Sequence, residues 1–417
     1  MGRPEPPRSH PDSRRPLVHR PVHETDTLEA FLEGAHPAFG GGFLRRVWEL
    51  LDEAVGRGVP MSLSVAGPVT ASGQHYAWLN PLLDTGWFAW ISVTDAICYH
   101  DAHRALRSVQ ESDFTEAPLF GDDAELREEG VIRIADLGFP EDVLLDTDRW
   151  LRELLARDEF QRRMAGPEFR HRLGAHLADL ERASGAREGL LALCRRKDLP
   201  VFVGAPADGS IFLNSMRLWA EGLPNGRPHR FELDLHAEVF ESCAYHAWGL
   251  FESEARNLGT LVLGGGVPKN FNLQPEPALG QVFELAGVRG YLYDVQITTA
   301  PVTDGSLSSC PPAEAVTWGK VDKDHYRKTT ESFQCDYSVV MPLLTKALLD
   351  KRERLRRRHE VEGDALFETV PEARGYLRPN EGERLFARRE ELLERLRERL
   401  AGRTPNPRTP ETPCSRS

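Results

Sequence analysis

The chain has 417 residues, of which 40% are hydrophobic and 28% charged, a balance typical of globular proteins with a sizeable core. Its formal net charge of -12 argues against a protein that tracks nucleic-acid phosphates, and leaves room for a cationic ligand. No apolar run approaches the roughly 20 residues needed to span a membrane, and the start of the chain lacks the apolar core of a secretory signal. The scattered cysteines form no CxxC pair or zinc-type Cys/His cluster, so we expect reduced thiols, a cytoplasmic location and no metal site.

Both ends of the chain lack a periodic apolar pattern. Residues 1–24 are rich in Pro, Arg and Ser, and residues 403–417 have a similar composition, so both segments are predicted to be disordered. Residues 25–350 are predicted to form one large domain. Residues 351–402 carry charges of both signs at i,i+4 spacing, which predicts a charged helical extension rather than a basic binding patch.

Between the termini, helix-like and strand-like segments alternate. Apolar residues recur at helical spacing in residues 43–55 and 143–160. Short strand-like runs occupy residues 61–65, 87–94, 199–204, 230–235, 260–266 and 291–299. This alternation predicts an α/β fold with a doubly wound, mainly parallel sheet and flanking helices.

Short glycine-containing turns follow four of the predicted strands, at residues 66–73, 204–210, 264–270 and 298–306. In doubly wound folds, ligands gather beyond the carboxyl ends of the strands, where such turns let backbone N–H groups approach a phosphate or ribose. None of the four is GxGxxG, and a single glycine triplet is more often a plain tight turn. Four turns at matching positions favour a nucleotide cofactor.

Lysine is scarce in this chain, yet Lys320 ends the stretch TDGSLSSCPPAEAVTWGK (residues 303–320), two residues after Trp318. A lysine that acts as a nucleophile must be neutral, so its pKa has to fall from ~10.4 through burial in an apolar pocket. An indole can supply such a wall, and its π face can also hold an ammonium group. The alternative for Lys320 is an ordinary surface lysine.

Four motifs occur in an order and spacing that resemble the deoxyhypusine synthase family. They are LVLGGGVPKNF (residues 261–271), DVQITTAPVTDGS (294–306), PPAEAVTWGK (311–320) and CDYSVVMPLL (335–344). The resemblance is strongest over residues 201–345, and it implies an NAD-binding Rossmann-like catalytic domain. It also implies a homotetramer whose active sites form between two subunits.

The family's chemistry begins with hydride transfer from spermidine to NAD, which leaves an imine. A lysine captures the butylamine portion as an enzyme imine and expels diaminopropane; an acceptor amine then displaces the lysine, and NADH reduces the product. Lys320 matches the imine-forming lysine, and Glu314 the carboxylate that anchors a polyamine amine, as a buried cation requires. Glu314 could instead be a helix-start carboxylate, and Trp318 could be plain core.

The resemblance also assigns residues to NAD. Asp304 and Asp336 could instead be turn or helix-cap residues, and Thr94 and Ser72 lie in more divergent segments. The assigned cofactor residues are Gly264, Gly265, Gly266, Thr299, Ala300, Asp304, Asp336, Asp208, Thr94 and Ser72.

The sequence departs from the protein-modifying members at the proton-transfer position. Lys269, Asn270 and Phe271 stand where those members have Lys-His-His, and an asparagine cannot take up a proton at pH 7. Either another group such as His100 or His236 does the proton work, or the substrate amine and water suffice. Asn270 remains a predicted substrate contact.

Two acidic polyamine anchors of the family are also missing. Leu307 stands in place of one aspartate, and Leu213 with Asn214 replaces another, so fewer or differently placed ammonium groups are expected. His100 occupies the position of a family glutamate, as in the bacterial deoxyhypusine synthase-like branch. His100 and Asn214 are therefore predicted substrate contacts.

This branch resemblance predicts an NAD-dependent aminobutyl transferase with a free amine as acceptor. The expected substrates are spermidine and putrescine, with homospermidine as the product. The alternatives are the same chemistry with agmatine or a protein lysine as acceptor, or a protein that binds NAD and polyamine without turnover.

Overall fold

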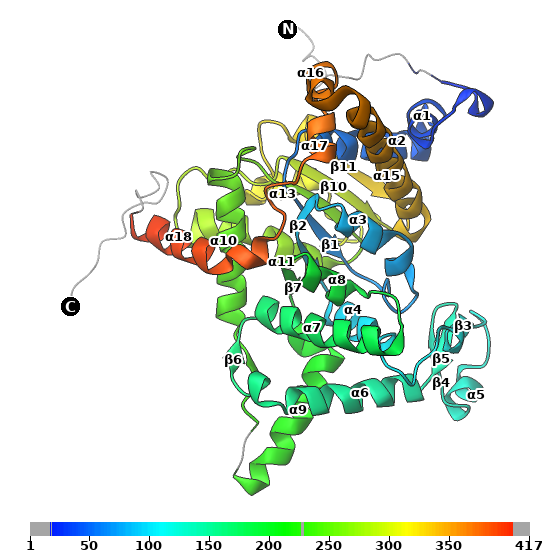
Figure 1. The fold of residues 1–417 in the computed structure, drawn as a ribbon, viewed down its shortest axis with the longest axis vertical. Coiled ribbons are helices and arrows are strands. Elements are labelled where there is room, and N and C mark those ends of the chain that lie inside the picture. The colour runs from blue at the N-terminus through cyan, green and yellow to red at the C-terminus, as the bar shows by residue number, and fades with distance from the viewer. Residues whose placement is uncertain (1–16, 18, 227–228, 403–417) are drawn as a thin grey trace, which may run out of the picture.

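A computed structural model describes residues 17, 19–226 and 229–402 (Figure 1). The predicted disordered tail, residues 403–417, lies outside the described residues, as does most of the predicted N-terminal arm. Within the rest of that arm, Val22–Glu24 forms a 3-10 turn. In the described part of the chain, no helix is both long and apolar enough to cross a membrane.

The centre of the molecule is a parallel sheet in the order β11-β10-β9-β1-β2-β7. Relabelled in chain order, this is the 3-2-1-4-5-6 arrangement of dinucleotide-binding folds, so the predicted α/β, doubly wound, Rossmann-like class is confirmed. Its strands are β1 (Met61–Val65), β2 (Phe88–Val93), β7 (Val201–Val203), β9 (Gly259–Leu263), β10 (Tyr293–Thr298) and β11 (Thr330–Gln334).

Two strand assignments differ from the sequence prediction. The predicted strand at 230–235 was wrong as a sheet strand: only β8 (Glu232–Leu233) is extended, and it pairs with β6 (Arg163–Met164) outside the main sheet. Asp234 ends it by accepting a hydrogen bond from Ala237 N as the N-cap of the next helix. β11 was missed because its sequence, TESFQ, is mostly polar and gives a weak apolar signal.

Helices cover both faces of this sheet, and α15 continues through residue 350, where the predicted extension was expected to start. The helices are α1 (Leu28–Gly34), α2 (Phe39–Gly56), α3 (Asn80–Asp84), α4 (Asp95–His103), α5 (Asp123–Glu128), α6 (Asp142–Leu155), α7 (Gly166–Ser184), α8 (Leu190–Arg196), α9 (Ser210–Gly222), α10 (Leu235–Phe251), α11 (Gly266–Leu273), α12 (Pro275–Pro277), α13 (Pro312–Ala315), α14 (Tyr326–Thr329), α15 (Tyr337–Glu362), α16 (Leu366–Thr369), α17 (Ala373–Leu377) and α18 (Arg389–Ala401).

The two faces of the sheet differ in chemistry. Successive side chains of a strand point to opposite faces. One face is apolar and packs into the main core with α2 and α15; its side chains include Met61, Leu63, Val65, Leu261, Leu263, Tyr293, Val295 and Ile297. The other face is buried but partly polar, with Ser62, Ser64, Thr260, Asp294 and Gln296.

Strand register brings these polar residues into rows across the sheet. Asp294 pairs with Thr260, and Thr260 pairs with Ser62, so the three lie side by side. Both faces are usually apolar in a parallel sheet covered by helices. Here Asn272 of α11 donates to Ser62 Oγ at 3.0 Å and to Thr260 Oγ1 at 2.9 Å, so hydrogen bonds join this polar row to α11.

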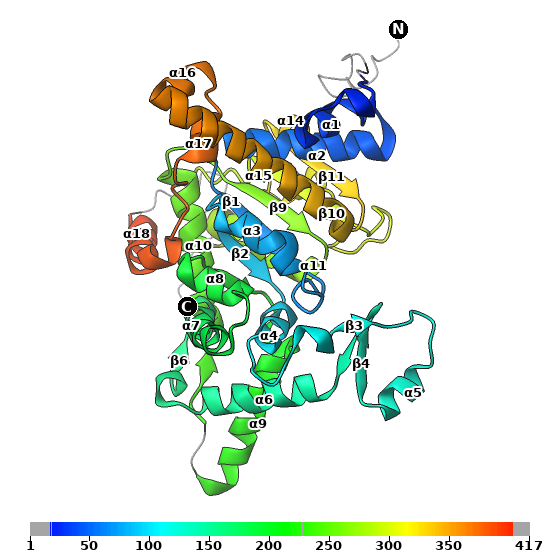
Figure 2. The same ribbon diagram turned by 45° about the vertical axis from the view of Figure 1, so that its right-hand side comes forward.

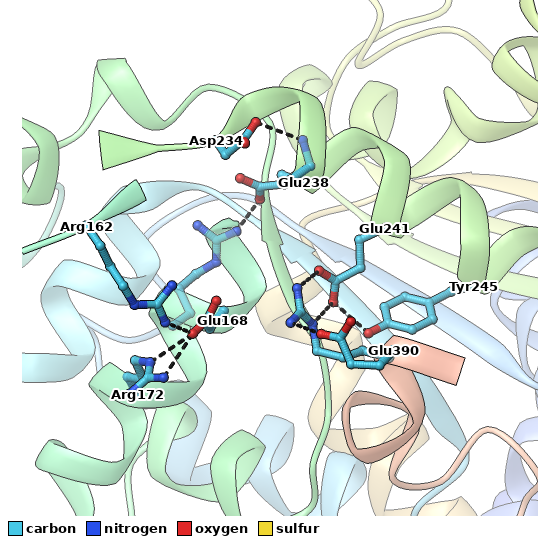
Figure 3. A network of polar contacts seen from close by, with 11 residues as sticks. Arg162, Glu168, Arg172, Asp234, Glu238, Glu241, Tyr245 and Glu390 are labelled. Carbon is cyan, nitrogen blue, oxygen red and sulfur yellow. Dashed lines mark hydrogen bonds and ion pairs between the residues drawn. The ribbon is translucent and has the colours of Figure 1, made fainter. Parts of the chain in front are cut away.

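The last helix, α18, packs along α10 (Figure 1). Arg389 donates to the buried Glu241 at 3.0 Å, and Tyr245 donates its hydroxyl to the same carboxylate at 2.7 Å (Figure 3). Buried leucines of α18 (Leu392, Leu396) join the core formed with α10. The C-terminal helix is therefore part of the folded domain.

A small sheet, β3-β5-β4, lies between α4 and α6 in the chain and to one side of the main sheet (Figure 2). Its strands are Thr115–Glu116, Leu137–Pro140 and Val131–Ile134. A separate minor core formed by Leu106, Val109, Phe139 and Val143 supports it.

Candidate functional site

The glycine triplet lies where the strand order reverses, between β1 and β9. Gly264 has φ +76°, which favours glycine, and its N–H donates to Ile297 O at 2.9 Å. A Cβ on Gly265 would lie 2.7 Å from the Cβ of Ala66, in the turn after β1. The two turns thus lie so close together that a side chain at position 265 would clash with Ala66.

Other predicted cofactor residues follow β10 and β11 at the same edge. Thr299 is exposed, and Ala300 N donates to Thr298 Oγ1 at 3.2 Å. Asp304 accepts from Ser306 N at 2.7 Å, and Asp336 caps α15 by accepting from Ser338 N at 2.8 Å. The turn and cap roles considered for the two aspartates are therefore present in the structure.

The remaining predicted cofactor residues follow β1, β2 and β7. Thr94 is the N-cap residue of α4 but makes no side-chain cap bond, and Asp208 is exposed after β7. Burial raises the pKa of Asp95, the first residue of α4, to about 6, and the nearby charge of Asp208 adds to this. Ser72 donates to Pro68 O at 2.9 Å. The predicted cofactor residues thus all lie in turns at the carboxyl ends of strands or at the helix starts that follow them.

Lys320 is buried beneath the helix that follows the glycine triplet. Its side chain is 8% exposed, and Nζ donates to Asn270 Oδ1 of α11 at 3.0 Å. The Trp318 ring centroid lies 6.0 Å from Nζ, and the indole is 59% exposed. Burial lowers the pKa of Lys320, and the positive charge of Lys269 lowers it further. Lys320 is not a surface lysine.

Glu314 lies on α13, in the segment that leads to Lys320. It is exposed, and its negative charge is close enough to raise the pKa of Lys269, although burial is the larger effect and lowers that pKa.

Lys269 is a site residue to which the sequence analysis gave no role. It is 1% exposed, and Nζ donates to Gln296 Oε1 and Cys310 O, both at 2.5 Å, and to Leu307 O at 3.1 Å. These bonds join α11 to the polar sheet face and to the loop that leads to Glu314. The signal in the sequence was a second lysine, one residue before Asn270, in a chain poor in lysine.

The predicted substrate contacts outside this cluster have other partners. His100 Nδ1 lies 2.9 Å from His103 Nε2, and burial lowers the pKa of His100 to about 4. Asn214 accepts from Arg152 at 2.7 Å and donates to Asp148 at 2.7 Å, which ties α9 to α6. His236 is exposed near the start of α10. Within one subunit none of the three contacts Lys320, as far as the described residues show.

Comparison with known proteins matches residues 32–348 to the family model described as deoxyhypusine synthase. A "Deoxyhypusine synthase-like protein" of Thermosynechococcus vestitus is 33% identical over 387 residues, covering 92% of this chain and 87% of that protein. Proteins with the same description in Nostoc sp. and Cyanothece sp. are 34% and 35% identical over 379 and 337 residues. The alignments cover 90% of this chain and 89% of the Nostoc protein, and 79% of this chain and 81% of the Cyanothece protein. With its nucleotide-binding strand order, its glycine turn and its buried lysine, this chain belongs to the deoxyhypusine synthase family.

Proposed function

We propose that this protein is an NAD-dependent aminobutyl transferase that moves the butylamine group of spermidine or putrescine through an imine on Lys320 to an acceptor amine. The observation that carries the proposal is Lys320 itself: this lysine is 8% exposed, burial lowers its pKa, and no described carboxylate is in hydrogen-bond contact with it. Burial favours the neutral form of this lysine, and imine formation requires that form.

The turns at the switch point fit an NAD molecule. Gly265 lies close to Ala66 and is the N-cap residue of α11, so this turn offers a helix N-terminus to a pyrophosphate. Thr94, Asp208, Thr299 and Asp304 border the same edge. When bound there, NAD accepts a hydride from the amine-bearing carbon and returns it at the end of the reaction.

Gly265→Ala is expected to weaken NAD binding about 10-fold or more, because its Cβ would force the 66–73 turn away from the triplet. Gly280→Ala is the matched control: a Cβ there meets Val288 at ordinary contact distance, 3.6 Å. Calorimetric titration with NAD measures both. Equal NAD affinity in the two variants would contradict this placement of the cofactor.

The residues around Lys320 suit a polyamine. Trp318 offers an indole face to an ammonium group, and Glu314 offers an exposed carboxylate. Lys269 donates to Leu307 O and Cys310 O and so holds the loop that precedes Glu314 in place. With Leu307 and Leu213 in place of acidic anchors, this site favours amines with few charges, which supports putrescine as acceptor and homospermidine as product.

The experiment that tests the proposal incubates the protein with NAD, spermidine and, in separate reactions, putrescine, agmatine or cadaverine. Mass spectrometry then identifies the polyamine products. Homospermidine from putrescine supports the proposed acceptor. A product only with agmatine would keep the chemistry and change the acceptor, and no product despite bound NAD would favour binding without turnover.

Asn270→His is expected to change amine preference more than NAD affinity. Asn270 Oδ1 accepts from Lys320 Nζ at 3.0 Å, so the new imidazole would face the reacting amine rather than the cofactor turn. The ratio of kcat/KM values for putrescine, agmatine and cadaverine, measured beside the Kd for NAD, checks this. Unchanged amine preference together with weakened NAD binding would contradict it.

We also propose a homotetramer with active sites between subunits, as in the family. One side of α9, which extends away from the sheet in both views, supports this (Figure 1; Figure 2). Its exposed apolar side chains, which an interface could cover, are Leu213, Met216 and Trp219. Sedimentation at micromolar protein concentration measures the assembly.

A further inference from the structure

The side chain of Asn272 fastens α11 to the sheet. Asn272 is 1% exposed, and its Oδ1 accepts from Trp90 Nε1 of β2 at 3.0 Å. An indole N–H only donates, so this contact fixes the orientation of the amide, whose Nδ2 donates to Ser62 Oγ and Thr260 Oγ1. The three partners lie on β2, β1 and β9, which are neighbours in the sheet. The helix that carries Asn270 is therefore tied to three adjacent strands.

The backbone of Tyr291 holds the backbone of Lys320. Tyr291 N donates to Lys320 O at 3.0 Å, and Tyr291 O accepts from Asp322 N at 2.9 Å. The preceding residue, Gly290, lies so close that a Cβ there would be 2.6 Å from the carbonyl carbon of Lys320. Lys320 N also donates to Ala315 O at 3.1 Å. Both backbone hydrogen-bonding groups of Lys320 are thus occupied, and its main chain is fixed against Tyr291.

A buried serine joins these two supports. Ser62 Oγ accepts from Asn272 Nδ2 and donates to the Tyr291 hydroxyl at 3.1 Å. This hydroxyl lies 2.7 Å from His246 Nε2 and 3.2 Å from Asn272 O. His246 Nε2 is also 3.1 Å from Asn272 O, so the hydroxyl donates to that carbonyl if Nε2 carries a hydrogen, and to Nε2 if it does not. The link through Ser62 is the same in both cases.

Lys320 and Asn270 are the two groups that this network brings together. Lys320 Nζ donates to Asn270 Oδ1 at 3.0 Å. Tyr291 sets the backbone position of Lys320, and Asn272 sets the place of α11 over the sheet. Buried amides and hydroxyls cost free energy unless each has its partners, and apolar side chains would pack a helix on a sheet without that requirement. A fully satisfied polar network instead specifies a single arrangement.

We propose that Asn272, Ser62 and Tyr291 are positioning residues for the Lys320 amine. Acting through the backbone of Lys320 and through α11, they hold Nζ at hydrogen-bond distance from the amide oxygen of Asn270. That bond orients the nitrogen, and in the neutral amine it leaves the lone pair free for the imine carbon of the substrate. The inference deepens the proposed lysine chemistry and rests on it.

The first test is Tyr291→Phe, which removes the hydroxyl and keeps the ring and the backbone bonds of residue 291. It is expected to lower kcat for polyamine product formation about 10-fold or more, because a misplacement of about 1 Å can cost about 10²-fold in rate. KM for the amine and Kd for NAD should change by less than about 2-fold, since uniform binding is not affected. A raised KM with unchanged kcat would overturn the proposal.

Tyr376→Phe is the matched control. Tyr376 is 1% exposed and Tyr291 is 0% exposed, and the Tyr376 hydroxyl donates to Asp52 of α2 at 2.6 Å. No described contact joins Tyr376 to Lys320. A hydrogen bond to a carboxylate is stronger than one between neutral groups, so urea unfolding should show at least as large a loss of stability in the control. Only Tyr291→Phe should lower kcat, and equal losses of kcat in the two variants would overturn the proposal.

Ser62→Ala tests the link itself, also if Tyr291→Phe does not fold. It removes the hydroxyl that joins Asn272 to Tyr291, so it should lower kcat as well. Added to Tyr291→Phe, it should cost less than about 2-fold more, because both changes break the same link. An unchanged kcat in Ser62→Ala, or losses that multiply in full, would overturn the shared link.

Reductive methylation gives a result that does not depend on turnover. Formaldehyde and cyanoborohydride are added at fixed pH, and peptide mass spectrometry follows the reaction at Lys320. This amine, 8% exposed in wild type, should react about 3-fold or more faster in Tyr291→Phe and Ser62→Ala, because local opening lets it reach solvent. Tyr376→Phe should match wild type. Rates unchanged in both network variants would overturn the proposal, whereas changed rates without any product from wild type would refute the proposed function alone.

Discussion

Replacing Lys320 with alanine is expected to abolish aminobutyl transfer, with a loss of about 10³-fold or more in product formation. No other described lysine combines burial with a contact to Asn270, so nothing can replace the imine-forming nitrogen. Borohydride added in the presence of NAD and spermidine should trap a reduced butylamine adduct on Lys320 in wild type, read by peptide mass spectrometry. The variant should show no adduct and should still bind NAD.

Lys323→Ala is the control, because Lys323 is only three residues away but 74% exposed. It should keep both the adduct and the turnover. Lys320→Arg should be as inactive as the alanine variant, since a guanidinium keeps the charge but does not form the imine. An adduct on another lysine of an active Lys320→Ala protein would refute the assigned role.

Arg170→Ala is expected to destabilise the protein by about 3–5 kcal/mol, because it strands the buried Glu238 without its partner. Arg170 and Glu238, the second of which is labelled in Figure 3, form an ion pair between α7 and α10, with side chains 2% and 1% exposed. Arg170 also donates to Val201 O at 2.7 Å, and Glu238 accepts from Val203 N at 3.0 Å, so the pair holds edge strand β7. Urea unfolding measures the change.

The control lies on the same helix. Arg172 pairs with Glu168, but the arginine is 37% exposed, so Arg172→Ala should cost about 1 kcal/mol or less. Arg170→Ala combined with Glu238→Gln should recover part of the loss, because no buried charge is then left alone. Equal losses for Arg170→Ala and Arg172→Ala would contradict the buried-charge argument.

Local sequence patterns predicted most strands of the central sheet. They missed β11, and they predicted a strand at 230–235 that does not belong to this sheet. The runs MSLSV and VLGGG are short, apolar and followed by glycine, so period and turn chemistry identified them. The run at 230–235 looked equally strand-like, but the Asp234 cap starts a long helix there. The edge strand β11 is mostly polar and so gave no apolar signal. It is a strand because its backbone pairs with β10, and this pairing cannot be read from the local sequence.

By itself the sequence determined the fold class, the glycine turns and the choice of Lys320, because periodicity, turn residues and motif order are local properties. The tertiary structure alone placed Glu276 beside His246, and placed the charges of Glu276 and Asp294 close enough to act on Lys320 and Lys269 respectively. These residues lie on α12, α10 and β10, and strand register and helix packing decide which of their side chains meet. Burial, which sets the charge of each group, depends on all of those contacts and on none of the local patterns.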